Sequence, residues 1–159
     1  MRALPLLLAL AAAPSPAMAQ SAITDAQVRT FMARQEAAWN AGELDRYFAG
    51  FTPQARFTDQ AYVGDKPPVP YGTSTLAQAR TQARKARARA KIRETGRVTR
   101  IQIGADGRSA RVVSNVASTV DTGGKVRHLC AYRGQALVLR GGRLLTMGQT
   151  DTFFKCASR

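Results

Sequence analysis

The side chains best suited to chemistry in this 159-residue chain are two aspartates and its single histidine. Asp59 ends a short strand-like run, and His128 and Asp151 lie on two later runs that are predicted to be neighbouring strands. Two carboxylates in one apolar cavity repel each other, which raises one pKa and makes a general acid or base usable near neutral pH. A histidine beside an aspartate would form a proton-transfer dyad. The pattern therefore permits acid–base catalysis.

Each of these side chains also has a plainer explanation. Asp59 precedes a turn, where an aspartate often bonds backbone amides. Asp151 could instead pair with an arginine on a neighbouring strand, and His128 could be an ordinary, partly buried histidine. A catalytic Asp59 should lie in a cavity within reach of a second titratable group, so exposure of Asp59 to solvent would argue against an enzyme.

The start of the chain has the features of a secretory signal peptide over residues 1–19. Arg2 precedes an apolar run over residues 4–13, and Ala17-Met18-Ala19 forms a small-residue cleavage site before Gln20. The apolar run is too short to span a bilayer, so we expect a soluble periplasmic or secreted protein with no transmembrane segment after cleavage. The remaining residues 20–159 suit a single domain.

The chain has two cysteines, Cys130 and Cys156, and an oxidising compartment favours a disulfide between them. Two cysteines and one histidine supply too few soft ligands for a structural zinc ion, and their spacing matches no zinc motif. We therefore expect no metal, and nothing in the sequence requires another cofactor.

The formal net charge of +14 is concentrated between Arg80 and Arg100. Such charge favours anionic partners, and for an exported protein these would be envelope polymers or acidic small molecules, with no nucleic acid expected. A helix predicted over residues 74–91 carries an exposed basic stripe of Arg80, Arg84, Arg87 and Lys91. The alternative is a solvated basic face without a specific partner.

The order of predicted elements indicates an α+β fold, with helices covering one face of a curved sheet. Thr24 and Gln27 form a capping box that starts a first helix, and Gly42 ends it. A second helix covers residues 44–51, a strand covers 55–59, and prolines predict that the loop over 64–72 is irregular. Four late strands, separated by glycine turns and therefore antiparallel, cover residues 98–103, 110–120, 126–139 and 144–154.

The segment Ala38-Trp39-Asn40-Ala41-Gly42-Glu43-Leu44-Asp45, followed by Ala55-Arg56-Phe57-Thr58-Asp59, resembles the opening of the nuclear-transport-factor-2-like superfamily. That group includes ketosteroid isomerases and SnoaL-like polyketide cyclases. The resemblance implies a conical fold of three N-terminal helices packed on a curved, mostly antiparallel sheet with a central pocket. It also implies a homodimer formed through the outer face of the sheet.

The resemblance places Asp59 where ketosteroid isomerases keep the carboxylate that shuttles the proton. Gln35 falls where those enzymes have the oxyanion-binding tyrosine, and Gln135 falls near their protonated aspartic acid. Amides are much weaker acids, so a steroid isomerase of the usual kind is disfavoured. Tyr62 and Tyr71 either cap the pocket mouth or are surface aromatics. The residues expected to line the pocket are Gln35, Trp39, Phe57, Tyr132, Gln135, Met147 and Gln149.

These observations favour an exported binding or accessory domain of SnoaL-like type for a small, partly apolar molecule. The competing hypothesis is a small lyase, isomerase or hydrolase in which Asp59 is the general base, assisted by Asp151, His128 or Gln35. A third hypothesis makes the basic helix over residues 74–91 a surface that binds anionic envelope polymers.

Overall fold

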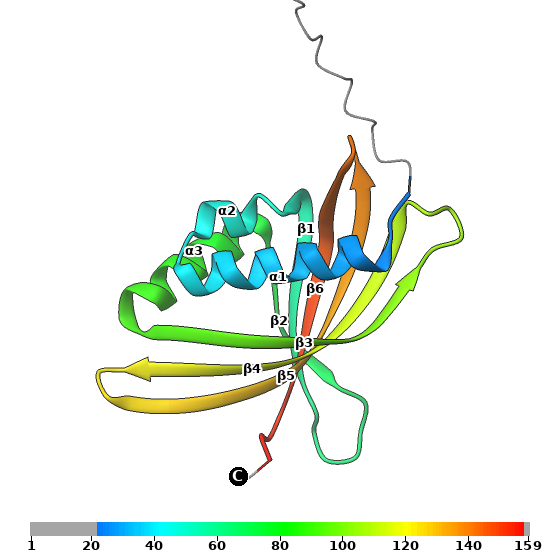
Figure 1. The fold of residues 1–159 in the computed structure, drawn as a ribbon. Helices are drawn as coiled ribbons and strands as arrows, with labels where there is room; N and C mark the ends of the chain where they lie inside the picture. Colours follow the sequence, from blue (N-terminus) through cyan, green and yellow to red (C-terminus); the bar gives the residue numbers. More distant parts are fainter. Residues whose placement is uncertain (1–21, 158–159) are drawn as a thin grey trace, which may run out of the picture.

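The computed structural model describes residues 22–157, so the expected signal peptide lies outside the described residues. Its helices pack on one side of a curved six-stranded sheet with the strand order β2-β1-β6-β5-β4-β3 (Figure 1). Neighbouring strands are antiparallel except β1 and β6, which are parallel. The elements are α1 (Asp25–Ala41), α2 (Leu44–Phe48), β1 (Phe51–Ala61), β2 (Val69–Thr75), α3 (Leu76–Arg89), β3 (Lys91–Ile103), β4 (Ser109–Thr122), β5 (Lys125–Arg140) and β6 (Arg143–Phe154).

The predicted caps of α1 are confirmed. Thr24 Oγ1 accepts a hydrogen bond from the Gln27 amide at 3.3 Å, and the Thr24 amide donates to Gln27 Oε1 at 2.8 Å. Gly42 ends α1 in the left-handed conformation with φ 77°, which costs glycine little. The second helix ends at Phe48, earlier than predicted, and Phe51 instead begins β1, where it is buried.

The prediction of an irregular loop over residues 64–72 is wrong in its second half, where β2 begins at Val69. Strand β2 lies at the edge of the sheet and pairs with β1 alone, so Pro70 removes no hydrogen bond that a second neighbour would need. The β1–β2 register shifts between Asp59 and Gln60, next to that proline.

The four late strands form the predicted antiparallel meander, and their turns contain glycines with positive φ. A bulge interrupts the last pair: Ala136 pairs with Gly148 and Leu137 with Thr146, which leaves Met147 unpaired. Met147 is 40 % exposed and lies outside the cavity described below, because the bulge breaks the alternation that was expected to turn it inward. Met147, which was expected in the pocket, is therefore not one of the residues that line this cavity.

The bulge also sets the register that the disulfide needs. Cys130 lies opposite Phe154, two residues before Cys156, and the two cysteines are bonded with their Cα atoms 5.3 Å apart. They are 26 residues apart in sequence, and the chain-entropy model gives about 3.5 kcal/mol for a loop of that size. The predicted disulfide is present, and the bulge lies beside Gly148.

Two groups of buried side chains join the helices to the sheet. Val28 of α1 packs with Val112, Leu137 and Leu139 at one end. At the other end Tyr47, Phe48 and Phe51 form an aromatic cluster with Trp39 and Phe57, whose neighbouring ring centroids lie 4.9–6.2 Å apart. No helix among residues 22–157 is long and apolar enough to cross a membrane.

Candidate functional site

A cavity of about 360 Å³ lies between α3, the aromatic cluster and the inner face of the sheet. Its apolar walls come from Trp39, Phe48 and Phe57 on one side and from Ile92, Leu129 and Phe153 on strands. A cavity that is mainly apolar with a few polar groups is the usual form of a small-molecule site. The acidic and basic side chains that line it are Asp59, Glu94, Arg133 and Asp151.

Arg133 of β5 bonds two carboxylates inside this cavity. Its Nη1 donates to Glu94 Oε1 at 2.5 Å, and its Nε and Nη2 donate to Asp151 Oδ1 and Oδ2 at 2.7 and 2.9 Å. The side chain of Arg133 is 14 % exposed and each carboxylate side chain is 11 % exposed. Burial opposes the charge on Arg133, but Asp151 and Glu94 outweigh it and hold the pKa of Arg133 above its ordinary value. Arg133, Glu94 and Asp151 thus form a charged trio whose side chains are held in place by these bonds.

A chain of amides supports the trio from the side. Gln149 Nε2 donates to Asp151 Oδ2 at 3.2 Å, and Gln135 Nε2 donates to Gln149 Oε1 at 3.2 Å. The hydroxyl of Tyr47 also donates to Gln149 Oε1, at 3.5 Å. Burial raises the pKa of Tyr47 above its ordinary value, so its phenol stays protonated. Because Asp151 can only accept while ionised, it fixes the direction of the whole chain.

Asp59 lies beside Asp151, since the two are register partners on the parallel strands β1 and β6. Asp59 is exposed as a residue, yet it lines the cavity, and it makes no hydrogen bond or ion pair to another residue in the described part of the chain. Partial burial raises the pKa of the Asp59 carboxyl, the charge of Asp151 raises it further, and Arg133 opposes both. Asp59 is thus an unpaired carboxylate at the rim.

The position of Glu94 is set by Asn40 of α1. Asn40 Nδ2 donates to the Glu94 carbonyl at 2.7 Å, and the Glu94 amide donates to Asn40 Oδ1 at 2.8 Å. The Gly96 amide donates to Glu36 Oε2 at 3.0 Å in the same way. Two side chains of α1 therefore bond the free edge of β3 and hold Glu94 against Arg133.

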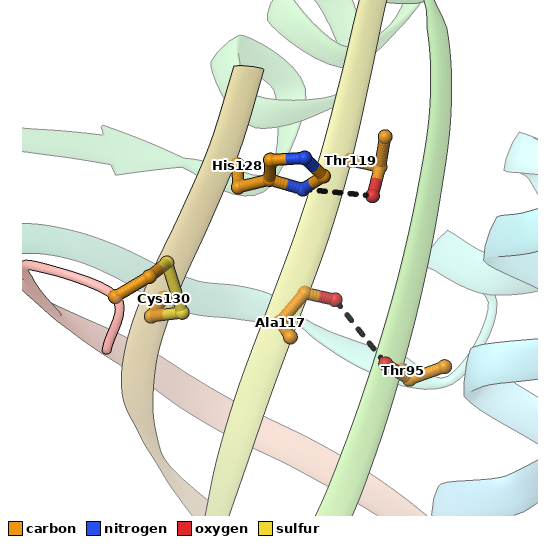
Figure 2. The surroundings of a disulfide bond; sticks show 6 residues. Thr95, Ala117, Thr119, His128 and Cys130 are labelled. Carbon is orange, nitrogen blue, oxygen red and sulfur yellow. Dashed lines mark hydrogen bonds between the residues drawn. A yellow bond between two sulfur atoms is a disulfide. The ribbon is translucent and has the colours of Figure 1, made fainter. Parts of the chain in front are cut away.

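The structure places His128 and Tyr132 away from the cavity. Both are exposed, on the outer face of β5, where Cys130 lies between them. Figure 2 shows His128 beside Thr119, whose Oγ1 is 3.4 Å from His128 Nδ1, and the Tyr132 ring stacks on Phe154 at 4.5 Å. A strand alternates between its two faces, so Arg133 and Gln135 face inward when His128 and Tyr132 face outward. The expected dyad of His128 with an aspartate is absent among residues 22–157.

Gln35 and Gln135 line a neighbouring cavity of about 280 Å³ between α1 and the sheet, not the cavity that holds Asp59. Gln35 Oε1, Gln135 Oε1 and Ser114 Oγ are buried there without a protein partner. Trp39, Phe57 and Gln149 do line the cavity with Asp59. Tyr62 and Tyr71 are 49 % and 63 % exposed, and the ring of Tyr71 lies 6.4 Å from that of Phe153.

The basic stripe predicted on the third helix is partly occupied by intramolecular contacts. Arg87 donates to the Trp39 carbonyl and lies over the Trp39 ring at 4.6 Å. Arg80 lies over the Phe48 ring at 5.6 Å. Arg84 Nη2 is 3.1 Å from Asp45 Oδ1 on the surface. Helix α3 ends at Arg89, so Lys91 belongs to β3 rather than to the helix. Only Arg84 and Lys91 of the four are exposed.

Among the described residues, no three His, Cys, Asp or Glu side chains are grouped so that they could hold a metal ion. Another hollow, of about 770 Å³, lies between α1 and the β5–β6 turn and is distinct from the cavity of Asp59. Arg34, Arg46 and Arg143 line that hollow, with no carboxylate among its lining residues. The two hollows thus have opposite charge.

Comparison with known proteins identifies the arrangement of strands and helices. No protein-family model matches the chain, and no curated protein sequence matches it. Among solved structures, an NTF-2 like protein of unknown function from Shewanella oneidensis has a TM-score of 0.59 at 13 % identity, covering 80 % of this chain and 97 % of its own. The chain has the nuclear-transport-factor-2-like fold.

Two further structures share the nuclear-transport-factor-2-like fold with this chain. A ketosteroid isomerase-like protein from Erwinia carotovora has a TM-score of 0.64 at 12 % identity, covering 82 % of this chain and 96 % of its own. The β subunit of the benzoate 1,2-dioxygenase from Burkholderia mallei has a TM-score of 0.65 at 14 % identity, covering 85 % and 93 %. A ketosteroid isomerase-like protein and a dioxygenase subunit thus share one fold. The fold alone does not give the function, which depends on the residues in the cavity.

Proposed function

We propose that this chain is an exported domain of SnoaL-like type that binds a small, partly apolar molecule in the cavity between α3 and the curved sheet. The observation that carries the proposal is the cavity itself, which combines aromatic walls with a fixed charged trio. An apolar body would bury its surface against Trp39 and Phe57, and the polar groups would orient it. The disulfide is consistent with export into an oxidising compartment.

Mass spectrometry of small molecules extracted from natively purified protein tests this proposal. A matched pair of variants locates the site: Ala83→Leu adds volume where α3 lines the cavity, and Ala77→Leu adds the same volume at an exposed position of α3. We expect Ala83→Leu to lose the co-purified molecule and Ala77→Leu to retain it. Equal retention by both variants, with both folded by circular dichroism, would reject the cavity as the site.

A second candidate function is an enzyme in which Asp59 is the general base. One observation favours it: Asp59 is an unpaired carboxylate that lines the cavity, with a pKa raised by burial and by Asp151. Two others count against it, because Asp59 is exposed at the rim and Asp151 is occupied by Arg133. Neither His128 nor Gln35 lines this cavity, so Asp151 is the one expected assisting group that lies beside Asp59.

Hydrogen exchange in the bound molecule separates binding from catalysis. The molecule recovered from native protein is incubated with fresh protein in deuterated water, and mass spectrometry measures the increase in its mass. A general base at Asp59 would catalyse deuterium incorporation that the Asp59→Asn variant loses. Incorporation at the same rate in both proteins, or none in either, would reject Asp59 as a general base.

A further inference from the structure

The ionisable residues of the cavity have the opposite balance from the rest of the chain. The sequence contains 24 lysines and arginines against 10 aspartates and glutamates. The cavity is nevertheless lined by three carboxylates, those of Asp59, Glu94 and Asp151, and by the single guanidinium of Arg133. A basic protein has thus placed an excess of negative charge in a cavity with several aromatic walls.

Arg133 does not neutralise all of that charge. Its guanidinium bonds Glu94 and Asp151, and no hydrogen bond joins it to Asp59. Asp59 lies next to Asp151 on the neighbouring strand, and it forms no ion pair with a basic side chain among residues 22–157, although the charge of Arg133 acts on it from a distance. Like charges at neighbouring strand positions destabilise each other, so a positive group placed between them would relieve the repulsion.

The aromatic walls of the cavity also suit a cation. Trp39 and Phe48 both line it, and each already has an arginine guanidinium over its ring, at 4.6 and 5.6 Å. The faces of aromatic rings attract cations through their quadrupole, and organic ammonium ions are recognised in this way. Phe57 and Phe153 line the same cavity, and among residues 22–157 no guanidinium or ammonium group lies over either ring.

We propose that the cavity selects a small organic cation, an amine or quaternary ammonium with an aromatic or aliphatic body, whose positive group lies against Asp59. The body packs between Trp39, Phe57 and Phe153, and the ammonium group faces the pair of Asp59 and Asp151. An organic anion is disfavoured because it would meet three carboxylates and an arginine that is already bonded. This inference rests on the proposed binding function and names its ligand class.

Three probes of similar size and different charge test the selection: benzylamine, benzyl alcohol and benzoate. The chain contains one tryptophan, and it lines the cavity, so quenching of Trp39 fluorescence reports occupancy directly. We expect benzylamine to bind at least about tenfold more tightly than benzyl alcohol, and benzoate to bind weakest. Because the whole chain is strongly basic, non-specific attraction would favour benzoate, which makes the opposite order diagnostic.

The Asp59→Asn variant locates the charge that selects the cation. It should bind benzyl alcohol as the native protein does and lose most of the preference for benzylamine. Asp65→Asn is the matched control, since it makes the same change in net charge at an exposed loop position outside the cavity, and it should keep the preference.

The outcomes separate this inference from the proposed function. Binding of benzyl alcohol and benzylamine with equal affinity, or an amine preference that survives Asp59→Asn, would overturn the cation selection and leave the binding function standing. Failure of all three probes to alter Trp39 fluorescence would also overturn the cation selection, whereas the binding function falls only if Ala83→Leu and Ala77→Leu retain the co-purified molecule equally.

Discussion

Arg133 and Asp151 are joined by two hydrogen bonds from one guanidinium, Nε to Oδ1 at 2.7 Å and Nη2 to Oδ2 at 2.9 Å, on neighbouring strands. This geometry is bidentate, which is the strongest form of the pair. It means that Asp151 is a structural carboxylate with its charge already matched. Of the two aspartates that could act as a base, only Asp59 is free to do so.

Removing Arg133 should be costly to the fold. Arg133→Met leaves Glu94 and Asp151 buried without a cation, and the loss of one partner from a buried ion pair typically costs about 3–5 kcal/mol in the free energy of unfolding. Urea denaturation measures the loss. Arg111→Met, at an exposed position on β4, is the control and should change stability by less than about 0.5 kcal/mol. A similar small effect of Arg133→Met would mean that the trio contributes little.

The pH dependence of stability should differ between Asp59→Asn and the native protein. The pKa of Asp59 is higher in the folded chain than its ordinary value of 3.8, so the folded state holds this proton more tightly than the unfolded state does. The native protein therefore loses stability as pH rises from about that value through the raised pKa. Asp59→Asn should be the more stable protein at neutral pH, and the advantage should disappear in acid.

Melting temperatures measured from pH 3 to pH 8 check this expectation. Asp106→Asn is a control of opposite sign, because hydrogen bonds from the Arg108 amide and the Ser109 hydroxyl lower the pKa of Asp106. That variant should be less stable than the native protein at neutral pH, with the difference shrinking in acid. If Asp59→Asn behaves like Asp106→Asn, the burial of the Asp59 carboxyl has been misjudged.

Gly50 and Gln35 should be energetically coupled. A Cβ atom on Gly50 would lie 1.5 Å from Gln35 Nε2, so Gly50→Ala must displace the Gln35 amide. We expect a loss of about 1–2 kcal/mol, the usual cost of overpacking. In a Gln35→Ala background the same change should cost less than about 0.5 kcal/mol. A double-mutant cycle by chemical denaturation measures the coupling, and additive effects would contradict it.

Asn40 should matter more for stability than its partly exposed position indicates. Asn40→Ala removes both hydrogen bonds to the Glu94 backbone and should cost about 2 kcal/mol. Hydrogen exchange of the Glu94 amide should accelerate at the same time, because that amide loses its acceptor. Asn115→Ala on β4 makes the same truncation away from this contact and should leave both measurements nearly unchanged.

The local features of the fold were predictable because they depend on neighbouring residues. Thr24, Gln27 and Gly42 fix the ends of α1 through caps that need no tertiary contact. The glycine turns fixed the antiparallel order of the late strands for the same reason. Pro70 misled the prediction because its effect depends on whether its strand lies at an edge, which only the tertiary pairing decides.

The site was harder to predict, because the inward face of a strand depends on register. Asp59 and Asp151 were expected to share a cavity, and the alternative that Asp151 pairs with an arginine on a neighbouring strand is confirmed by Arg133. The sequence shows the alternation of His128, Tyr132 and Arg133 but not which side faces the core, and a shift of one residue exchanges the faces. Glu94 was missed because its place depends on Asn40, 54 residues earlier.

The contacts that α1 makes to β3 have a consequence beyond the site. Strand β3 ends the sheet, and the outer edge of a terminal strand offers unpaired amides and carbonyls to which another chain can add. Asn40 occupies both backbone groups of Glu94, and Glu36 occupies the amide of Gly96, so two side chains take the bonds that an incoming strand would require. The same helix that positions Glu94 thereby protects this part of the protein from growth into intermolecular sheet.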